Sequence, residues 1–200
     1  MVMTDEQDWI SAPLFDRELA LRASRVKLVA TDVDGVLTDG GVYYSDVGEA
    51  LKRFSVRDGM GVERLRNDGV EIAFVTRELS PIVARRAEKL KVQLCYLGVS
   101  DKKAVLPRLL GDAGIDASQL AYIGDDVNDA GIMAAVARDG LVGAPLDAIP
   151  SLLHGAHYRC RRPGGYGAFR DFAEWILDLR AKARAQVGTA HSDQQWGGLS

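Results

Sequence analysis

The chain has 200 residues, of which 47% are hydrophobic and 26% are charged, and its formal net charge is −3. This length supports one well-packed α/β domain and leaves little for a second. The slightly negative net charge gives no sign of the positively charged surface that binds nucleic acid. The sequence contains no run of lysine and arginine that would indicate binding to a membrane surface, and no apolar stretch reaches membrane-spanning length. The acidic amino terminus lacks the pattern of a signal peptide, so we expect a cytoplasmic protein.

Helices and strands are expected to alternate along most of the chain. A short helix over residues 14–24 precedes an apolar run at 26–30, which is typical of a buried parallel strand. A β-hairpin with its loop at Ser45-Asp46-Val47-Gly48 follows that strand. The later expected helices span 59–67, 81–90, 102–114, 128–137, 147–153 and 169–185, and the later strands span 70–75, 92–97, 120–124, 140–142 and 157–160.

This order of elements predicts the fold. Strands that alternate with helices join through right-handed crossovers and form a mostly parallel sheet. We therefore predict a three-layer, doubly wound α/β domain, of Rossmann type, with a β-hairpin insertion after the first strand. Residues 13–185 are expected to form this single domain, after a poorly ordered lead-in at 1–12. The polar, glycine-rich residues 186–200 are expected to be a disordered tail.

Polar side chains stand where four of the predicted strands end. Because the carboxyl ends of parallel strands meet at one edge of a sheet, these side chains are expected to share one pocket. Two carboxylates held close together are costly unless a cation lies between them. The pattern therefore indicates a divalent cation and a phosphate group. In chain order the strand-end residues are Asp32 and Asp34, then Thr76, then Lys102, and finally Asp125 and Asp126.

These motifs resemble those of the haloacid dehalogenase superfamily of phosphotransferases. The match consists of Asp-Val-Asp-Gly-Val-Leu-Thr at 32–38, Thr76, Lys102 and Gly-Asp-Asp-Val-Asn-Asp at 124–129, and it covers about residues 26–172. The resemblance implies a HAD-like fold and a phosphatase in which Asp32 is the nucleophile, giving an aspartyl-phosphate. It also implies that Asp34 protonates the leaving alkoxide and then deprotonates the hydrolytic water.

The same resemblance implies a Mg²⁺ site. Asp32, Asp125 and the backbone carbonyl of Asp34 would hold the ion, with Asp126 and Asn128 orienting its ligands from behind. Thr76, Lys102 and backbone N–H groups of the 32–35 turn would hold the phosphoryl oxygens, although Lys103 is an alternative to Lys102. For Asp129, a role in the site and that of an acidic residue at a helix N-terminus stay open.

Further segments of the sequence indicate which branch of the superfamily the chain resembles. Only a hairpin follows the first motif, and one helix and one strand separate Thr76 from Lys102, so there is no cap domain. The chain resembles the small tetrameric phosphatases of 3-deoxy-octulosonate (KDO) 8-phosphate and of nonulosonate (KDN or N-acetylneuraminate) 9-phosphates. This resemblance implies a phosphorylated sugar acid as substrate and a homotetramer assembled through the hairpins. The matching segments are 54–61, 86–92, 121–129 and 163–172.

The second motif departs from the family pattern. The octulosonate enzymes usually carry Thr-Gly-Arg and the nonulosonate enzymes Thr-Gly-Glu, whereas this chain has Thr76-Arg77-Glu78. Glu78, with Arg86 and Lys89 on the following helix, matches the nonulosonate pattern, in which the basic pair comes from the adjacent subunit. A solvated helix face explains Arg86 and Lys89 equally well. Arg77 either adds a cation to the pocket or narrows it.

The late glycine-rich segment at 164–170 is the last candidate. By resemblance, its residues, including Gly165 and Arg170, would reach a neighbour's pocket; an ordinary turn before the last helix is the alternative. The sequence therefore predicts a Mg²⁺-dependent phosphomonoesterase that acts on a phosphorylated acidic sugar. The alternatives are a phosphatase of broad specificity and, in another class, a non-catalytic or receiver-like phospho-binding module.

Overall fold

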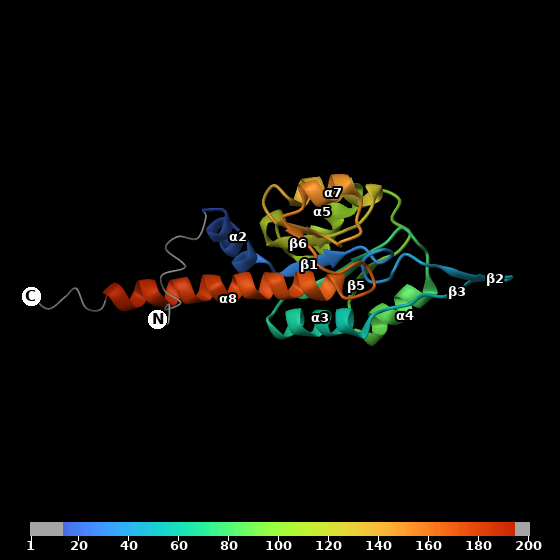
Figure 1. The fold of residues 1–200 in the computed structure, drawn as a ribbon, viewed down its shortest axis with the longest axis horizontal. Coiled ribbons are helices and arrows are strands. Elements are labelled where there is room, and N and C mark those ends of the chain that lie inside the picture. Colours follow the sequence, from blue (N-terminus) through green and yellow to red (C-terminus); the bar gives the residue numbers. More distant parts are fainter. Residues whose placement is uncertain (1–13, 195–200) are drawn as a thin grey trace, which may run out of the picture.

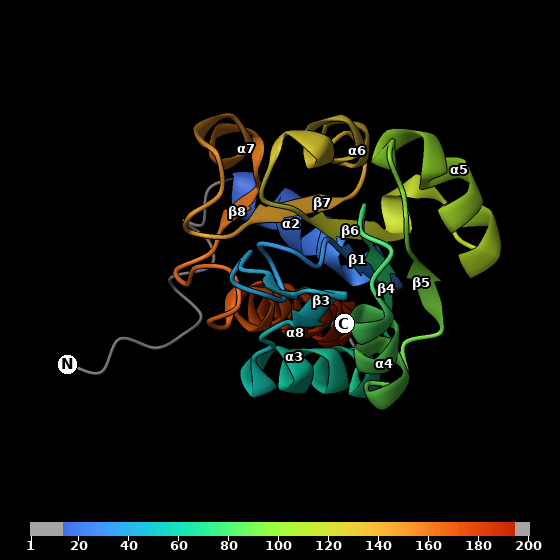
Figure 2. The ribbon, with the colours of Figure 1, turned by 90° about the vertical axis from the view of Figure 1, so that its right-hand side faces the viewer.

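The computed structural model describes residues 14–194 (Figure 1). It is built on one sheet of parallel strands in the order β5-β4-β1-β6-β7-β8 (Figure 2). The chain builds outward from β1 to β4 and β5, then crosses back to β6 on the other side. Open α/β sheets bind ligands at such a switch point. The bounds are β1 (Leu28–Thr31), β4 (Glu71–Val75), β5 (Leu94–Tyr96), β6 (Leu120–Ile123), β7 (Leu141–Ala144) and β8 (Tyr158–Arg159).

Helices cover both faces of this sheet, which confirms the three-layer prediction (Figure 2). Side chains alternate along each strand, so Val29 packs on one face while Leu28 and Ala30 pack on the other. The first face is covered by α2 (Leu14–Arg25), α3 (Val56–Asn67), α4 (Pro81–Lys89) and α8 (Ala168–Gln194). The second is covered by α5 (Lys102–Ala113), α6 (Ala130–Val136) and α7 (Pro150–Gly155).

A hairpin of β2 (Tyr43–Ser45) and β3 (Gly48–Leu51) projects away from the sheet, as expected between the first strand and the first later helix (Figure 1). An isolated bridge between Thr38 and Phe54 closes its base. Two short 3₁₀ helices, η1 (Ala117–Gln119) and η2 (Val127–Asp129), flank β6. None of the helices in the described part of the chain is long and apolar enough to cross a membrane.

Several helix boundaries differ from the expectation, among them α6, which starts at Ala130 instead of 128, and α7, which spans Pro150–Gly155 instead of 147–153. α3 starts at Val56 instead of 59, because the Ser55 hydroxyl accepts a hydrogen bond from the Arg57 N–H and caps the helix there. The last helix continues to Gln194 and so ends later than the expected 185, whereas the disordered tail at 186–200 stays a prediction. Residues 180–186, Arg-Ala-Lys-Ala-Arg-Ala-Gln, are all good helix formers, so no local signal ends the helix at 185. The expected lead-in at 1–12 and residues 195–200 lie outside the described residues.

Candidate active site

The carboxyl ends of β1, β4 and β6 meet around one cavity of about 330 Å³. Among the strand-end residues singled out from the sequence, the structure brings both members of each acidic pair and Thr76 to its wall. The lining residues are Asp32, Asp34, Gly35, Gly40, Thr76, Arg77, Glu78, Asp125, Asp126, Val127 and Asn128.

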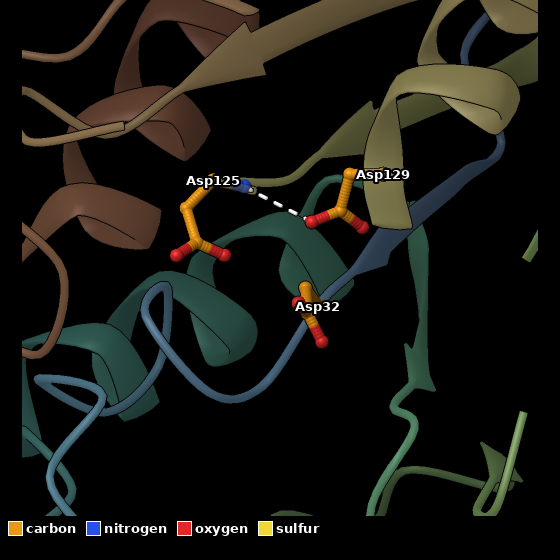
Figure 3. Close-up of side chains that lie close together, drawn as sticks. All are labelled: Asp32, Asp125 and Asp129. Carbon is orange, nitrogen blue, oxygen red and sulfur yellow. Dashed lines mark hydrogen bonds between the residues drawn. The ribbon is translucent and has the colours of Figure 1, made fainter. Parts of the chain in front are cut away.

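Three carboxylates cluster at this cavity: Asp32 and Asp125 line it, and Asp129 is fully buried beside them. Asp32 follows β1, where its N–H donates to the Ile123 carbonyl at 3.0 Å, and Asp125 and Asp129 follow β6. One carboxylate oxygen from each of the three lies within 4.8 Å of the others (Figure 3). Asp129 thus joins the acidic cluster, whereas the sequence left its role open.

Both oxygens of Asp129 already have donors. Its Oδ1 accepts from the Lys102 ammonium at 2.8 Å and from the Tyr122 hydroxyl at 2.6 Å. Its Oδ2 accepts from the backbone N–H groups of Asp125 and Asp126 at 3.1 and 3.4 Å (Figure 3 draws the first). Its side chain makes no capping bond to α6. Asp129 is therefore a fully buried anchor that holds the lysine and the 125–126 backbone in place.

Lys102 reaches the same cluster from the start of α5. Its ammonium lies 2.6 Å from Asp32 Oδ2 and 2.8 Å from Asp129 Oδ1, and the residue is 1% exposed. Lys103 is exposed. Of the two neighbouring lysines, only Lys102 is thus in position to act on a group held at Asp32.

The acidic cluster fits a divalent cation. Burial, followed by the charge of Asp129, raises the pKa of Asp32 well above its ordinary value and that of Asp125 to about 7, although Lys102 opposes both shifts. Asp125 Oδ1 and Asn128 Oδ1 are buried without a hydrogen-bond donor. A dication supplies the missing charge and reverses these pKa directions. Since Asp129 is saturated by donors, Asp32 and Asp125 are the side chains suited to ligate it.

Gly35 allows the turn after β1 to approach Asp125. Its φ is +89°, in the left-handed region, and a Cβ built there would lie 1.9 Å from Asp125 Oδ2. Any side chain at this position would therefore push the two acidic loops apart. Glycine at position 35 therefore permits the close approach of the turn after β1 to Asp125.

Asp34 is held from two sides. Its Oδ2 accepts from the Thr76 hydroxyl at 3.3 Å, and its Oδ1 pairs with the ammonium of Lys52. Lys52 follows β3 and also lies 3.0 Å from Glu49 Oε1. Burial alone would lower the pKa of Lys52, but its bonds to Asp34 and Glu49 outweigh burial and raise it. Sequence reasoning missed Lys52, since no motif contains it and only the folded hairpin brings it to Asp34.

The remaining candidates divide into two groups. Arg77 and Glu78 line the cavity and are exposed at its mouth. Arg86 and Lys89 do not line it: the Arg86 guanidinium donates to the Ser55 carbonyl at 3.1 Å, and Lys89 borders a separate groove between α3 and α4. Within one chain, the basic pair of α4 therefore does not reach this cavity.

The glycine-rich segment packs on the turn of its own chain. The Gly165 N–H donates to the Val36 carbonyl at 2.9 Å, and a Cβ on Gly164 would lie 1.9 Å from the Gly35 carbonyl oxygen. Arg170 instead pairs with Glu174 at 2.6 Å. Neither Gly165 nor Arg170 lines this chain's cavity. The segment thus braces the 32–38 turn from outside.

Comparisons with known proteins agree with this geometry. No protein-family model matches the sequence. The 3-deoxy-D-manno-octulosonate 8-phosphate phosphatase KdsC of Yersinia pestis is 38% identical over 181 residues, which cover 90% of this chain and 95% of that protein. The enzyme of the same name from Moraxella catarrhalis, solved with magnesium ion, phosphate ion and KDO, is 34% identical with a TM-score of 0.76, covering 86% of this chain and 98% of that one.

A structure described as a putative HAD superfamily (subfamily III A) hydrolase, from Legionella pneumophila, is 33% identical with a TM-score of 0.77, covering 90% of this chain and 97% of that one. These relatives share the fold and nearly the full length of the chain. The chain is therefore a phosphoric monoester hydrolase that belongs to the 3-deoxy-D-manno-octulosonate 8-phosphate phosphatase family of the HAD superfamily.

Proposed function

We propose that the protein is a Mg²⁺-dependent phosphatase that hydrolyses a phosphorylated 2-keto-3-deoxy sugar acid, with KDO 8-phosphate as the first substrate. The observation that carries the chemistry is the convergence of Asp32, Asp34, Thr76, Lys102 and Asp125 at one sheet edge. The sugar comes from the names of the relatives and from the KDO bound in the Moraxella catarrhalis enzyme.

The metal is proposed from the donor set. Asp32 and Asp125 would hold Mg²⁺ with the backbone carbonyl of Asp34, because hard cations prefer oxygen ligands. Asp126 and Asn128 would orient that shell, Asn128 through an Oδ1 that is buried without a donor. When bound, the ion neutralises charge on the transferring phosphoryl group.

The reaction then has two displacements. In the first, a carboxylate oxygen of Asp32 bonds to phosphorus, the P–O bond to the sugar breaks, and Asp34 protonates the departing oxygen. In the second, water attacks phosphorus, Asp34 takes its proton, and the acyl-phosphate bond breaks to release inorganic phosphate and free Asp32. Lys102 and Thr76 would neutralise and orient the phosphoryl oxygens throughout.

Recognition of the sugar acid is proposed for the exposed mouth and for a second subunit. Arg77 and Glu78 stand at the mouth, while Arg86, Lys89, Gly165 and Arg170 are proposed to act from a neighbouring chain. A homotetramer assembled through the hairpin would bring them there. The hairpin exposes Tyr43, Tyr44 and Val47 by 57, 72 and 91%, which is the kind of apolar surface that an interface covers.

A nonulosonate 9-phosphate is the second candidate. Glu78, which lines the cavity, occupies the position where the octulosonate pattern has arginine. A carboxylate there disfavours a second carboxylate and favours substrate hydroxyl groups, which donate to it. The support for a nonulosonate is therefore the match of Glu78 to the pattern of that group.

One panel tests these proposals. We expect the highest kcat/KM for KDO 8-phosphate, lower values for KDN and N-acetylneuraminate 9-phosphates, and much lower values for simple sugar phosphates. A reversed order of the two sugar-acid classes would select the nonulosonate reading, and a flat panel would select broad specificity. Sedimentation of the wild type and of Tyr44→Glu tests the assembly, since a hairpin interface predicts that the substitution lowers the mass of the particle.

The nucleophile has its own test. Asp32→Asn is expected to lower kcat by at least about 10⁴-fold, because the amide cannot form the acyl phosphate. The exposed Asp139→Asn is the matched control and should keep wild-type turnover. Substantial turnover by Asp32→Asn would remove Asp32 from its proposed role, and trapping of labelled phosphate on the wild type but not on the variant would support it.

A further inference from the structure

Lys52 is a buried cation that lies outside every motif of the site. Its side chain has no exposed surface, and its ammonium contacts Asp34 Oδ1 and lies 3.0 Å from Glu49 Oε1. A lysine is almost never fully buried unless it is paired. Lys52 directly follows the hairpin strand β3, so its position depends on the hairpin and not on the parallel sheet. The hairpin thus places one buried positive charge against Asp34, which lines the cavity.

The contact of Lys52 fixes one of two oxygens on Asp34. The other, Oδ2, faces the Thr76 hydroxyl at 3.3 Å, and that hydroxyl in turn accepts from the Glu78 N–H at 3.1 Å. An aspartate on a turn has two side-chain torsions, and its terminal torsion is broad. Donors on both oxygens restrict it to one orientation.

Lys52 is itself anchored at its far side. Glu49 Oε2 accepts a hydrogen bond from the Ser80 hydroxyl, and Ser80 caps α4 by accepting from the Val83 N–H at 3.3 Å. Ser80 is 2% exposed. The series Asp34, Lys52, Glu49, Ser80 therefore connects the proposed acid and base to a rigid helix end through ionic and hydrogen-bonded contacts.

We propose that Lys52 is a positioning residue that holds Asp34 in the orientation required for proton transfer. This inference rests on the proposed function, in which Asp34 protonates the leaving oxygen. Because Lys52 occupies Oδ1, the proton that moves is carried on Oδ2, the oxygen nearer Thr76. The proton passes to the ester oxygen as the P–O bond breaks, while the Asp32–phosphorus bond forms without any contact to Lys52.

Leaving groups of different basicity distinguish this role from a structural one. An alkoxide requires a proton as it leaves, whereas para-nitrophenolate leaves without one, so only the first depends on Asp34. In Lys52→Met we expect the rate of enzyme phosphorylation by KDO 8-phosphate to fall by about 30-fold or more, since misplaced acid catalysis loses much of its 10²–10⁴-fold effect. The pre-steady-state burst of nitrophenolate should change by less than about threefold, and KM for both esters likewise.

Three controls complete the experiment. Exposed Lys103→Met should leave both rates unchanged. Lys52→Arg, which keeps the charge, should recover part of the alkyl-ester rate. The rise in Tm on adding Mg²⁺ should persist in Lys52→Met, which separates the effect from loss of the metal or of the fold.

Equal losses for both esters in Lys52→Met, or no loss for either, would overturn the positioning role. If the wild type hydrolyses simple alkyl phosphates but not sugar-acid phosphates, the proposed substrate is wrong. The role of Lys52 is then tested by comparing glycerol phosphate with para-nitrophenyl phosphate. If the wild type hydrolyses no phosphate ester at all, the role of Lys52 falls together with the proposed function. Loss of the Mg²⁺-dependent rise in Tm in Lys52→Met would also contradict it.

Discussion

The floor of the cavity and its rim are built in different ways. The floor consists of Asp32, which lines the cavity, and the side chains buried behind it, Lys102, Tyr122 and Asp129. These residues are at most 4% exposed and are joined by three charge-assisted contacts no longer than 2.8 Å. The rim, formed by Arg77, Glu78 and Val127, is exposed, Val127 by 72%. A change in the floor therefore alters the fold and the chemistry together, whereas a change in the rim can alter the choice of substrate alone.

The strongest test of this difference is Asp129→Ala. It would leave the ammonium of Lys102 and the hydroxyl of Tyr122 without their shared acceptor. We expect a loss of about 3 kcal/mol in the free energy of unfolding, measured by urea denaturation, because a buried charge loses its partner. The kcat should fall by about 100-fold or more, because Lys102 and the 125–126 loop lose their anchor.

Asp126→Ala is its control. The Asp126 side chain caps η2 by accepting from the Val127 N–H at 2.7 Å and is exposed. Loss of such a cap costs about 1 kcal/mol. If Asp129→Ala and Asp126→Ala lowered the free energy of unfolding by the same amount, the floor would contribute no more to the stability of the fold than the exposed Asp126 does.

Asp58 is a buried acid that does not belong to the floor. It can therefore test how burial affects stability, separately from any effect on catalysis. Asp58, at 2% exposure, accepts from the Arg170 N–H at 2.9 Å, and burial raises its pKa from 3.8 to about 6. The folded state thus binds this proton more tightly than the unfolded chain does. Its contribution to stability is greatest below pH 4 and falls by about 3 kcal/mol as the pH rises through 6.

Asp58→Asn removes this ionisation. The difference in free energy of unfolding between the wild type and the variant should therefore change by about 2 kcal/mol between pH 4 and pH 7, with the wild type losing more. Denaturant unfolding across that range measures it, with exposed Asp139→Asn as the variant whose curve follows the wild type. Parallel curves for Asp58→Asn and the wild type would contradict the raised pKa.

The brace behind the floor offers a third test. A Cβ on Gly164 would clash with the Gly35 carbonyl oxygen, whereas no atom lies within 4 Å of a Cβ on Gly155. We expect Gly164→Ala to lose about 1–3 kcal/mol by overpacking, and to lose activity because the 32–38 turn must move. Gly155→Ala should stay within about 0.5 kcal/mol of the wild type. Similar Tm values for the two variants would show that the turn tolerates displacement.

The smallest structural effect is expected at the rim. Glu78→Arg should leave Tm within experimental error, because the side chain is exposed. The ratio of kcat/KM for KDO 8-phosphate over N-acetylneuraminate 9-phosphate should rise by about tenfold, a typical effect of one polar contact. A large fall in Tm would show that the rim supports the fold, and an unchanged ratio would show that it does not select the substrate.

The parallel sheet, the hairpin and the shared pocket were predictable from the sequence. Buried strands read as apolar runs, and polar residues at their carboxyl ends converge whenever the strands are parallel. The expectation that Asp32, Thr76 and Asp125 line one cavity needed no knowledge of side-chain packing. The pocket could be predicted from local sequence patterns because each strand is followed directly by its polar residues.

Two features of the site were not predictable. Asp129 stands at the start of a helix, where an acidic residue has an ordinary explanation, and only its complete burial against Lys102 and Tyr122 distinguishes the alternatives. The contact of Lys52 with Asp34 depends on how the hairpin folds back, which no local pattern encodes. The end of α8 was also misplaced, because the helix continues to Gln194 through residues such as Gly188 and Thr189 that are weak helix formers.

The packing of Gly164 against Gly35 has a consequence for synthesis of the protein. The loop that carries Asp32 leaves the ribosome early, but the segment that braces it follows β8, the last strand of the sheet. Domains generally fold as units as the chain emerges. A nascent or truncated chain that ends before this segment therefore carries the loop of Asp32 without its support. We expect phosphatase activity to appear only when almost the entire domain has been translated.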